Sequence, residues 1–403
     1  MKKILVVSQY FYPEQFRIND ICKELIDDGY DVTVLTGIPN YPKGKFYSGY
    51  GLFKKRKETV DGINIIRMPI ISRGNNAIKL SLNYISFLIS GSFWAFFTRK
   101  VYDSVFIYEV SPMTQAIPGV LYAKKRKIKS HIYVMDLWPE NFVSMSGIKN
   151  KFIVNKITNM VNYIYNNVST ILISSPQFAD NIKLLGNYEN KIKYWPQYAE
   201  DFYEPTDEKS TDILFDMDKF NITFAGNIGY AQGLSILTKT VENLINDGVN
   251  NISINLIGDG RYKEELMKEV KSKKLDNFIK FYNPVSANEI PKIMSQTDAA
   301  LISLSKDPIY SLTIPAKFQS IIAMGVPIVA SSDGVLEDII KNNNIGVWGP
   351  SEDEDALYRN IKYISSLGKE QIKSMSVNAL TLSNEKFNKI NLLKDLEDIL
   401  EES

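Results

Sequence analysis

The sequence is poor in the residues that build redox and metal centres. It has one cysteine, Cys22, and one histidine, His131. A single cysteine excludes an internal disulfide framework and any zinc or iron–sulfur site made of several thiolates, and a single histidine excludes a histidine-rich centre. Cys22 falls on the apolar face of a predicted helix, so we interpret it as a packing residue. We therefore expect no metal site, and a reducing compartment such as the cytoplasm.

The whole chain is nearly neutral, but its two halves carry net charges of opposite sign. The net charge is +1, yet residues 1–200 hold 26 Lys and Arg against 15 Asp and Glu, and residues 201–403 hold 21 against 31. In the basic half, the clusters 54–57 and 124–127 lie beside apolar runs. This pattern suits an anionic membrane leaflet better than nucleic acid, although solvated loops are the alternative.

Long hydrophobic runs are also few. The apolar stretch 4–7 is too short for a secretory signal, so we expect the protein to stay in the cytoplasm. The segment 80–98 carries no charge and is just long enough to span a bilayer, but serines, Asn83 and Gly91 interrupt it. We expect a helix whose aromatic side chains dip into the inner membrane surface. A helix packed in the core is the alternative, and a true span is disfavoured.

Short apolar runs alternate with helical patterns along the chain, which predicts an α/β protein with parallel sheets. The expected strands are 3–8, 31–36, 104–109, 131–135, 170–174, 221–225, 252–257, 278–282, 299–304 and 328–331, with an extended pair over 60–68. An acidic, proline-containing stretch, 197–210, predicts a linker between a domain of residues 1–196 and a domain of residues 211–385. The remainder, 386–403, is expected to form a helix over 388–400 that packs on another element.

Two glycine-rich turns mark the second domain. The turn 226–233 follows a strand and precedes helical periodicity from Leu234, so its glycines allow sharp turning and close approach to a ligand. Free N–H groups at a helix start favour an anion. A second turn at Gly258 and Gly260 follows the next strand, with the cation Arg261 beside it. Two such turns at one sheet edge predict a nucleotide diphosphate site.

Polar loops follow the strands of the first domain at their carboxyl ends, where ligands of doubly wound sheets bind. The loops containing Glu14 and the pair Asn40 and Tyr41 are candidates for acceptor binding, although purely structural loops are an equal alternative. Asp136 and Glu140 follow a later strand. A carboxylate pair can serve as acid and base, but at this spacing it is as often a helix cap and a surface charge.

Six short motifs recur in an order that resembles a known family. They are Tyr-Pro-Glu at 12–14, Pro-Asn-Tyr-Pro at 39–42, Asp-Leu-Trp-Pro-Glu at 136–140, the glycine turns 226–233 and 258–260, and Pro-Ala-Lys at 315–317. Together they resemble glycosyltransferase family four, in particular its capsule, O-antigen and slime-polysaccharide branch, which includes fucosamine transferases. The resemblance implies the GT-B fold: two facing Rossmann-like domains, with the donor nucleotide on the second and the acceptor on the first. It also implies a last helix that crosses back onto the first domain.

The resemblance further implies a retaining, metal-independent transferase without a cofactor. Its donor would be a UDP-sugar, and we expect the transferred sugar to be an N-acetylated hexosamine such as N-acetylfucosamine. Its acceptor would be a saccharide linked to polyprenyl diphosphate at the inner membrane surface, in capsule or O-antigen biosynthesis. No nucleic acid partner is expected.

Residue roles follow from the matching motifs. Lys317, at a helix start, would be the cation beside the diphosphate, a solvated lysine being the alternative, and Asp136 would orient the acceptor or the incoming sugar. Donor contacts are expected at Gly226, Asn227, Ile228, Gly229, Gly258, Arg261, Gly334 and Glu337. Without a metal, such N–H groups and cations must stabilise the leaving diphosphate.

The sequence also departs from this family. Where members usually carry two glutamates eight positions apart, it has Leu312 and Ser320, and Met135 stands where a histidine is frequent. Asn227 and Gln232 take the places of an arginine and a lysine. No general base is therefore evident. Two other functions stay open: a GT-B nucleotide-sugar epimerase, and a catalytically inactive subunit that anchors a partner transferase at the membrane.

Overall fold

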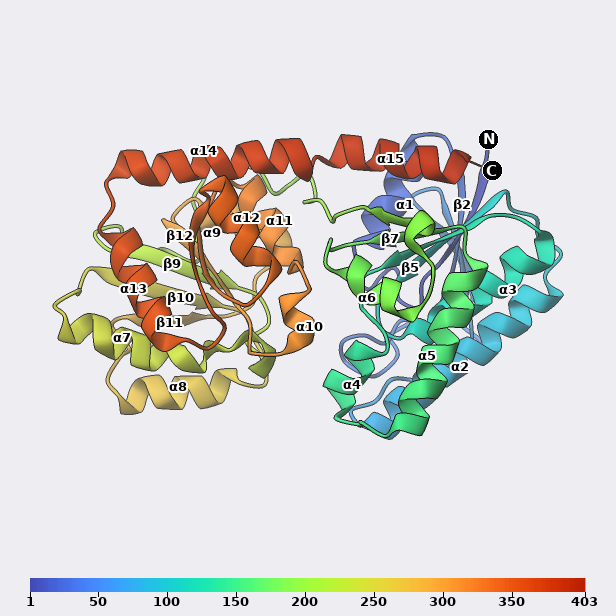
Figure 1. Cartoon of the computed structure of the whole chain (residues 1–403), viewed down its shortest axis with the longest axis horizontal. Helices are drawn as coiled ribbons and strands as arrows, with labels where there is room; N and C mark the ends of the chain where they lie inside the picture. The colour runs from blue at the N-terminus through green and yellow to red at the C-terminus, as the bar shows by residue number, and fades with distance from the viewer. Residues whose placement is uncertain (403) are drawn as a thin grey trace. The chain divides into compact units, whose positions relative to one another are not determined.

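The computed structural model describes residues 1–402 and separates into two compact units. Unit 1 comprises Met1–Pro196 together with the segment from Ile390 onward, and unit 2 comprises Gln197–Lys389. Each unit has its own sheet with helices on both faces (Figure 1). The α/β class predicted from the alternating pattern is confirmed.

The sheet of unit 1 has eight strands in the order β3-β4-β2-β1-β5-β6-β7-β8. All neighbours are parallel except the hairpin pair β3 and β4. Every residue of β5 is buried, as expected for a parallel strand covered on both faces. The strands are β1 Lys3–Val7, β2 Asp31–Thr36, β3 Lys57–Val60, β4 Ile63–Arg67, β5 Ser104–Glu109, β6 Ser130–Val134, β7 Thr170–Ile173 and β8 Ile192–Tyr194.

The helices of unit 1 cover the sheet because each has an apolar stripe. In α1 the buried residues Ile18, Ile21, Cys22 and Leu25 recur at helical spacing, so the packing role expected for Cys22 is observed. Helix α3 packs on both α2 and α5 (Figure 1). The helices are α1 Ile18–Asp27, α2 Ala77–Phe97, α3 Ala116–Arg126, α4 Glu140–Ser146, α5 Lys151–Asn167, α6 Phe178–Leu185 and α15 Lys389–Glu401, with the 3-10 turns η1 Met113–Gln115 and η2 Glu189–Lys191.

The sheet of unit 2 has six parallel strands in the order β11-β10-β9-β12-β13-β14. Chain order reverses direction at the β9/β12 boundary, and in unit 1 it does so at β1/β5. Ligands of doubly wound sheets bind outside the carboxyl ends of the strands at such switch points. The strands are β9 Phe220–Ala225, β10 Ile252–Ile257, β11 Ile279–Tyr282, β12 Ala299–Ser303, β13 Ile328–Ser331 and β14 Gly346–Gly349.

The helices of unit 2 enclose two apolar clusters, one on each face of its sheet. Helix α7 packs with α13, and α11 packs with α14. The helices are α7 Leu237–Asn246, α8 Lys263–Ser272, α9 Ile290–Met294, α10 Pro308–Ser311, α11 Ala316–Ala323, α12 Val335–Asn343, α13 Glu354–Ser365 and α14 Lys369–Lys386, with the 3-10 turns η3 Tyr230–Gln232, η4 Leu234–Ile236 and η5 Ala287–Glu289.

The segments expected as a linker and a last helix have defined contacts. The backbone N–H of Ser210 donates to the carbonyl of Lys292 at 3.2 Å, so the end of the 197–210 stretch packs on α9 within unit 2. The indole Nε1 of Trp195 donates to the carbonyl of Leu392 at 2.7 Å, and the Tyr30 hydroxyl donates to the Glu401 carboxylate at 3.0 Å. Both bonds tie α15 to the sheet layer of unit 1.

Candidate active site

The two glycine turns of unit 2 are joined backbone to backbone at the carboxyl ends of β9 and β10. The N–H of Gly226 donates to the carbonyl of Ile257 at 2.9 Å, and the N–H of Ile228 donates to the carbonyl of Asp259 at 2.8 Å. The carbonyl of Ile228 in turn accepts from the N–H of Tyr262 at 3.1 Å. The turns therefore form one continuous backbone surface beside the β9/β12 switch point.

Glycine is required where these turns meet. A Cβ on Gly258 would lie 1.9 Å from the carbonyl oxygen of Gly226, and a Cβ on Gly260 would lie 2.2 Å from that of Ile228. Gly226 and Gly258 also have φ of +144° and +142°, values that favour glycine. Any side chain at Gly258 would push the turns apart.

The structure alters two expectations about anion binding by this turn. The N–H of Ile228 is already bonded to Asp259 and its side chain is fully buried, so Ile228 supplies shape and no free donor. Among residues 1–402, the N–H groups of Asn227 and Gly229 have no acceptor. The 3-10 turns η3 and η4 also intervene, so α7 begins only at Leu237, later than the predicted start at Leu234. The N-terminus of α7 therefore does not lie directly next to the glycines of the turn.

Lys317 supplies the cation at this surface. It is the second residue of α11, and its Nζ lies 3.6 Å from the position of a Cβ on Gly226. The ammonium donates to Oε1 of Gln232 at 2.9 Å and sits 3.8 Å from the ring centroid of Phe224, a cation–π contact. The side chain is thus held over the first glycine turn by a neutral amide and an aromatic ring.

These neutral, buried surroundings change the pKa of Lys317. Burial lowers the pKa of Lys317 to about 7, from an ordinary value of 10.5. No carboxylate forms an ion pair with it among the described residues, so nothing offsets the cost of desolvating its charge. An anionic ligand over Gly226 would supply the missing counter-charge. Gln232, which the sequence showed only as a departure from the resembled family, is the residue that orients this amine.

Three other predicted donor contacts lie at the same edge with different surroundings. Gly334 has φ +79°, and a Cβ there would lie 2.0 Å from the carbonyl oxygen of Ser311. The carboxylate of Glu337 is paired with Lys341 at 2.6 Å on the surface of α12. Arg261 is exposed beside the second glycine turn. Gly334 therefore fixes a loop against α10, whereas Glu337 already has a cation partner.

The carboxylates that the resembled family uses have no replacement at the matching positions. Leu312 ends the short helix α10, and Ser320 is buried inside α11. Among the described residues, no group of three or more His, Cys, Asp and Glu side chains is arranged to hold a metal ion. In this unit, Lys317 and Arg261 are cations beside the glycine turns, and Lys263 donates to the carbonyl of Gly258 at 2.7 Å.

In unit 1, Glu14 joins the loops that follow β1 and β2. Its Oε1 accepts from the N–H groups of Asn40 and Tyr41, both at 2.6 Å, and its Oε2 accepts from the N–H of Phe11 at 3.3 Å. The residue is only 2% exposed. Burial raises the pKa of Glu14 to about 7 despite these three donors, which act to lower it. The carboxylate predicted to touch the acceptor is therefore turned inward and shapes the loops instead.

Tyr41 and an arginine not singled out from the sequence form the accessible part of this edge. The Arg73 guanidinium stacks over the Tyr41 ring at 5.1 Å and donates through Nη1 to the Tyr10 hydroxyl at 3.1 Å. Asn40 is buried, and its Oδ1 accepts from the N–H of Arg73 at 2.8 Å. Arg73 follows β4, at whose carboxyl end the sheet topology leads one to expect a ligand contact.

Asp136 lies one loop further along the same edge. Its Oδ2 accepts from the N–H of Ser111 at 2.7 Å, which links the loops after β5 and β6. It is half-buried, and its charge contributes to a raised pKa of Tyr84, whose main cause is burial. Asp136 thus interacts electrostatically with Tyr84. Tyr84 is hydrogen-bonded to Tyr10, whose hydroxyl accepts from Arg73.

Two other ionisable groups of unit 1 lie away from the accessible edge. His131 is the second residue of β6, and burial lowers its pKa to about 4, so it is neutral at pH 7. Glu109 ends β5 and is fully buried. Burial, with the nearby Asp136 charge, raises its pKa well above the ordinary value. Glu109 is therefore a buried carboxyl group close to the Asp136 loop.

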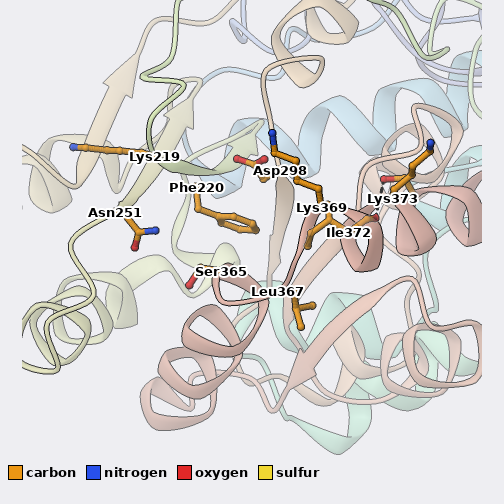
Figure 2. A pocket seen from close by; sticks show the side chains of 10 residues that line it. Lys219, Phe220, Asn251, Asp298, Ser365, Leu367, Lys369, Ile372 and Lys373 are labelled. Atoms are coloured by element: carbon orange, nitrogen blue, oxygen red, sulfur yellow. Dashed lines mark hydrogen bonds between the residues drawn. The ribbon is translucent and has the colours of Figure 1, made fainter.

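A cavity of about 450 Å³ in unit 2 lies at the opposite edge of its sheet (Figure 2). Phe220 begins β9, while Asn251 and Asp298 immediately precede β10 and β12, so these lining residues belong to the amino ends of the strands. The Oδ2 of Asp298 accepts from the N–H of Asn221 at 2.7 Å. This cavity is separate from the surface formed by the glycine turns and Lys317.

Helix α2 presents an unusual apolar surface. One helix face is packed: Asn83, Phe87, Gly91 and Ala95 are its buried residues, and a Cβ on Gly91 would lie 2.8 Å from Pro118 of α3. The remaining surface is largely exposed, and only 22% of an 18-residue apolar stretch of this helix is buried. By length and composition alone, α2 is apolar enough to cross a membrane. Packing in the protein core, the alternative interpretation of this segment, explains only the buried face of α2.

Both basic clusters of the sequence meet the end of this helix. Arg126 donates through Nη2 to the carbonyl of Thr98 at 2.8 Å, and Lys125 contacts the carbonyl and the ring of Phe96. Arg56, from the other cluster, lines a groove together with Phe93 and Phe97. Two clusters that are about seventy residues apart in sequence thus flank one apolar surface.

Two doubly wound parallel-sheet units are the architecture of the GT-B fold, as predicted. Residues 205–380, which lie in unit 2, match the family model described as glycosyl transferases group 1. The chain therefore has a GT-B fold, and its unit 2 is similar to the glycosyl transferases group 1 family. No curated protein sequence matches the chain.

Solved structures share this fold over the full length of the chain. Sucrose-phosphate synthase from Thermosynechococcus elongatus is 13% identical with a TM-score of 0.76, covering 99% of this chain and 98% of the other. Anabaena HepE in complex with UDP-glucose is 14% identical with a TM-score of 0.69, covering 99% of both chains. WaaG, a glycosyltransferase involved in lipopolysaccharide biosynthesis, is 11% identical with a TM-score of 0.68, covering 100% of both chains.

Proposed function

We propose that the protein transfers a sugar from a UDP-sugar to a saccharide linked to polyprenyl diphosphate, at the inner face of the cell membrane. The observation that carries the proposal is the Lys317 ammonium, held over Gly226 at a switch point without an anionic partner among the described residues. The glycosyl transferases group 1 match and the UDP-glucose complex of the similarly folded HepE support a nucleotide-sugar donor.

The proposed chemistry retains the anomeric configuration and uses no metal or cofactor. The bond between the anomeric carbon and the diphosphate oxygen breaks, and an acceptor hydroxyl oxygen bonds to that carbon on the same face. The hydroxyl proton passes to the leaving phosphate oxygen, so no protein base is needed. Lys317, Arg261 and the free N–H groups of Asn227 and Gly229 would stabilise the leaving diphosphate.

Unit 1 would hold the acceptor. Oδ2 of Asp136 is bonded to the N–H of Ser111, which leaves Oδ1 to orient a sugar hydroxyl. Arg73 offers a cation suited to phosphate, and the partly exposed Tyr41 lies beside it. An N-acetylated hexosamine such as N-acetylfucosamine is the proposed sugar, and capsule or O-antigen synthesis the proposed pathway. The fold shared with WaaG, which acts in lipopolysaccharide biosynthesis, supports that pathway.

The protein is proposed to be cytoplasmic and peripheral on the inner membrane surface. The apolar face of α2, flanked by two basic clusters, supports this location because such a surface combines apolar burial with attraction to anionic lipids.

Calorimetric titration with UDP, GDP and dTDP, without added metal, tests the donor site. We expect selective UDP binding. Binding of none of the three would contradict the diphosphate site and favour an inactive membrane-anchoring subunit. Turnover of a UDP-sugar to its epimer without any acceptor would instead identify an epimerase.

A further inference from the structure

An apolar groove of about 570 Å³ runs between helix α2 and the segment that follows β4. Its walls include Met68, Ile89, Phe93, Trp94 and Phe97, and Arg56 stands beside them. This volume lies in the range of about 300–1,000 Å³ that is usual for small-molecule sites. The groove belongs entirely to unit 1.

The groove leaves large apolar side chains in contact with water. Ile89, Phe93 and Phe97 are 63%, 65% and 64% exposed, although each lines the groove. Phe93 and Phe97 contact each other with their ring centroids 4.5 Å apart. Exposed apolar surface arranged in this way marks a binding site for an apolar group or a membrane.

We propose that this groove binds the hydrocarbon chain of the lipid-linked acceptor; this assignment rests on the proposed function. A flat bilayer surface needs only the convex, exposed face of α2. The groove differs from such a surface because Met68 and Pro69 form a second wall beside the helix. An apolar groove of this size can hold one hydrocarbon chain lying along it.

Charge at the groove favours a phosphate-bearing lipid. Arg56 is the cation that lines the groove. The acid nearest to Arg56 in the sequence, Glu58, is already paired with Arg67 at 2.5 Å. A cation beside an apolar groove matches a hydrocarbon chain that ends in a diphosphate.

The groove also connects to the edge where the acceptor saccharide would bind. Met68 lies at the groove, and Arg73, five residues later, stacks on Tyr41 at the carboxyl edge. Five extended residues span at most about 17 Å. Asn83 of α2 holds the middle of this segment through a hydrogen bond to the carbonyl of Ile71 at 2.6 Å. A lipid diphosphate and a short saccharide would cover this distance.

Titration with farnesyl diphosphate and dimethylallyl diphosphate tests the proposal, because the two probes share a headgroup and differ in chain length. Trp94 fluorescence, corrected with a Trp94→Phe variant, reports occupancy of the groove. We expect farnesyl diphosphate to bind about tenfold or more tighter, because the longer chain buries more apolar surface. Equal affinities for the two probes would overturn the proposal.

Two variants separate the groove from the general membrane surface. Ser90→Phe fills the groove while keeping α2 apolar, so it should abolish the preference for farnesyl diphosphate and preserve binding to vesicles rich in phosphatidylglycerol. Ile78→Ser, on the same helix and 74% exposed, should weaken vesicle binding and leave the preference intact. Ser90→Leu fills less of the groove and also keeps α2 apolar, so it should weaken the preference for farnesyl diphosphate if Ser90→Phe folds poorly. Vesicle binding without any chain preference would assign the whole surface to the bilayer.

A parallel UDP titration on the same samples keeps the two proposals distinguishable. A chain preference without UDP binding would contradict the donor site alone. UDP binding without a chain preference would contradict the groove assignment alone.

Discussion

The carboxyl edges of the two sheets are built by different means, although both follow a topological switch point. In unit 2 the edge is mainly backbone, since a Cβ on Gly258 would overlap the carbonyl oxygen of Gly226, and the φ of +144° at Gly226 favours glycine. In unit 1 the edge is mainly side chains, with Glu14 buried beneath Tyr41 and Arg73. A backbone surface suits a diphosphate, whose recognition needs donors at fixed positions. A side-chain surface can vary with the acceptor while the fold stays constant.

The largest effect on UDP binding is expected for Gly258→Ala. The new Cβ would overlap the carbonyl oxygen of Gly226 at 1.9 Å, so the two turns must separate. We expect UDP affinity to fall about 100-fold or more and the melting temperature to drop by about 4 °C or more, measured by calorimetry and thermal unfolding. Gly248→Ala is the matched control, because its φ is also positive at +79° but no atom lies within 4 Å of its Cβ position. Equal losses in the two variants would assign the effect to backbone strain alone.

Lys317→Met should have the next largest effect. It removes the cation over Gly226 and keeps an apolar stem of similar length against Phe224. A charge-assisted contact to phosphate is worth about 1.5–3 kcal/mol, so we expect UDP affinity to fall about 10- to 100-fold with the fold intact. Lys271→Met, an exposed lysine in the last turn of α8 and away from the glycine turns, serves as the control. Unchanged UDP affinity in Lys317→Met would remove this lysine from the donor site.

The lowered pKa of Lys317 also predicts that donor binding by unit 2 depends on pH. Because the pKa of Lys317 is about 7 without ligand, binding of an anion above pH 7 requires proton uptake. The affinity for UDP-N-acetylglucosamine should therefore fall between pH 7 and 8.5, by at most about tenfold per pH unit. Calorimetry in buffers of different ionisation enthalpy measures the proton uptake directly. A Lys317→Met protein that kept the same pH dependence would assign it elsewhere.

The same pKa has a consequence for stability. The unfolded chain, in which the lysine has its ordinary pKa of 10.5, binds more protons than the folded chain between pH 7 and 10.5. Stability of unit 2 should therefore rise with pH across this window, and Lys317→Met should remove that part of the rise. Thermal unfolding of both proteins at several pH values gives the comparison.

Glu14→Ala should have the smallest effect on UDP binding while destabilising unit 1. It leaves the N–H groups of Phe11, Asn40 and Tyr41 without their shared acceptor. We expect a loss of about 1–3 kcal/mol in the free energy of unfolding of unit 1, with UDP affinity unchanged. Hydrogen exchange at Asn40 and Tyr41 localises the effect. A large loss of UDP affinity would show that the two edges are not independent.

Much of the fold could be predicted because buried parallel strands leave a clear sequence signal. The strands 31–36, 104–109, 252–257 and 328–331 match the observed β2, β5, β10 and β13 to the residue. The short edge strands β8 and β14 were not predicted, because neither is mostly buried and each has only three or four residues. An edge strand needs one partner only, so its sequence has little apolar pattern.

The candidate site was predictable in position more than in detail. Strand ends and glycines located both edges, because topology places ligand loops there. Sequence alone could not show that Glu14 turns inward, since a carboxylate in a polar loop is normally exposed. It also could not show that the N–H of Ile228 donates to the carbonyl of Asp259, or that Arg73 donates to Tyr10, which lies sixty-three residues away in the sequence. Such pairings depend on tertiary packing.

The shared carboxylate of Glu14 has a practical consequence for engineering. Since one side chain fixes both the 11–14 and the 40–41 loops, neither loop has an independent shape. Grafting a single loop from another enzyme would break hydrogen bonds in the loop that was left unchanged. Transplanting acceptor specificity into this scaffold therefore requires both loops and the glutamate to be exchanged as one cassette.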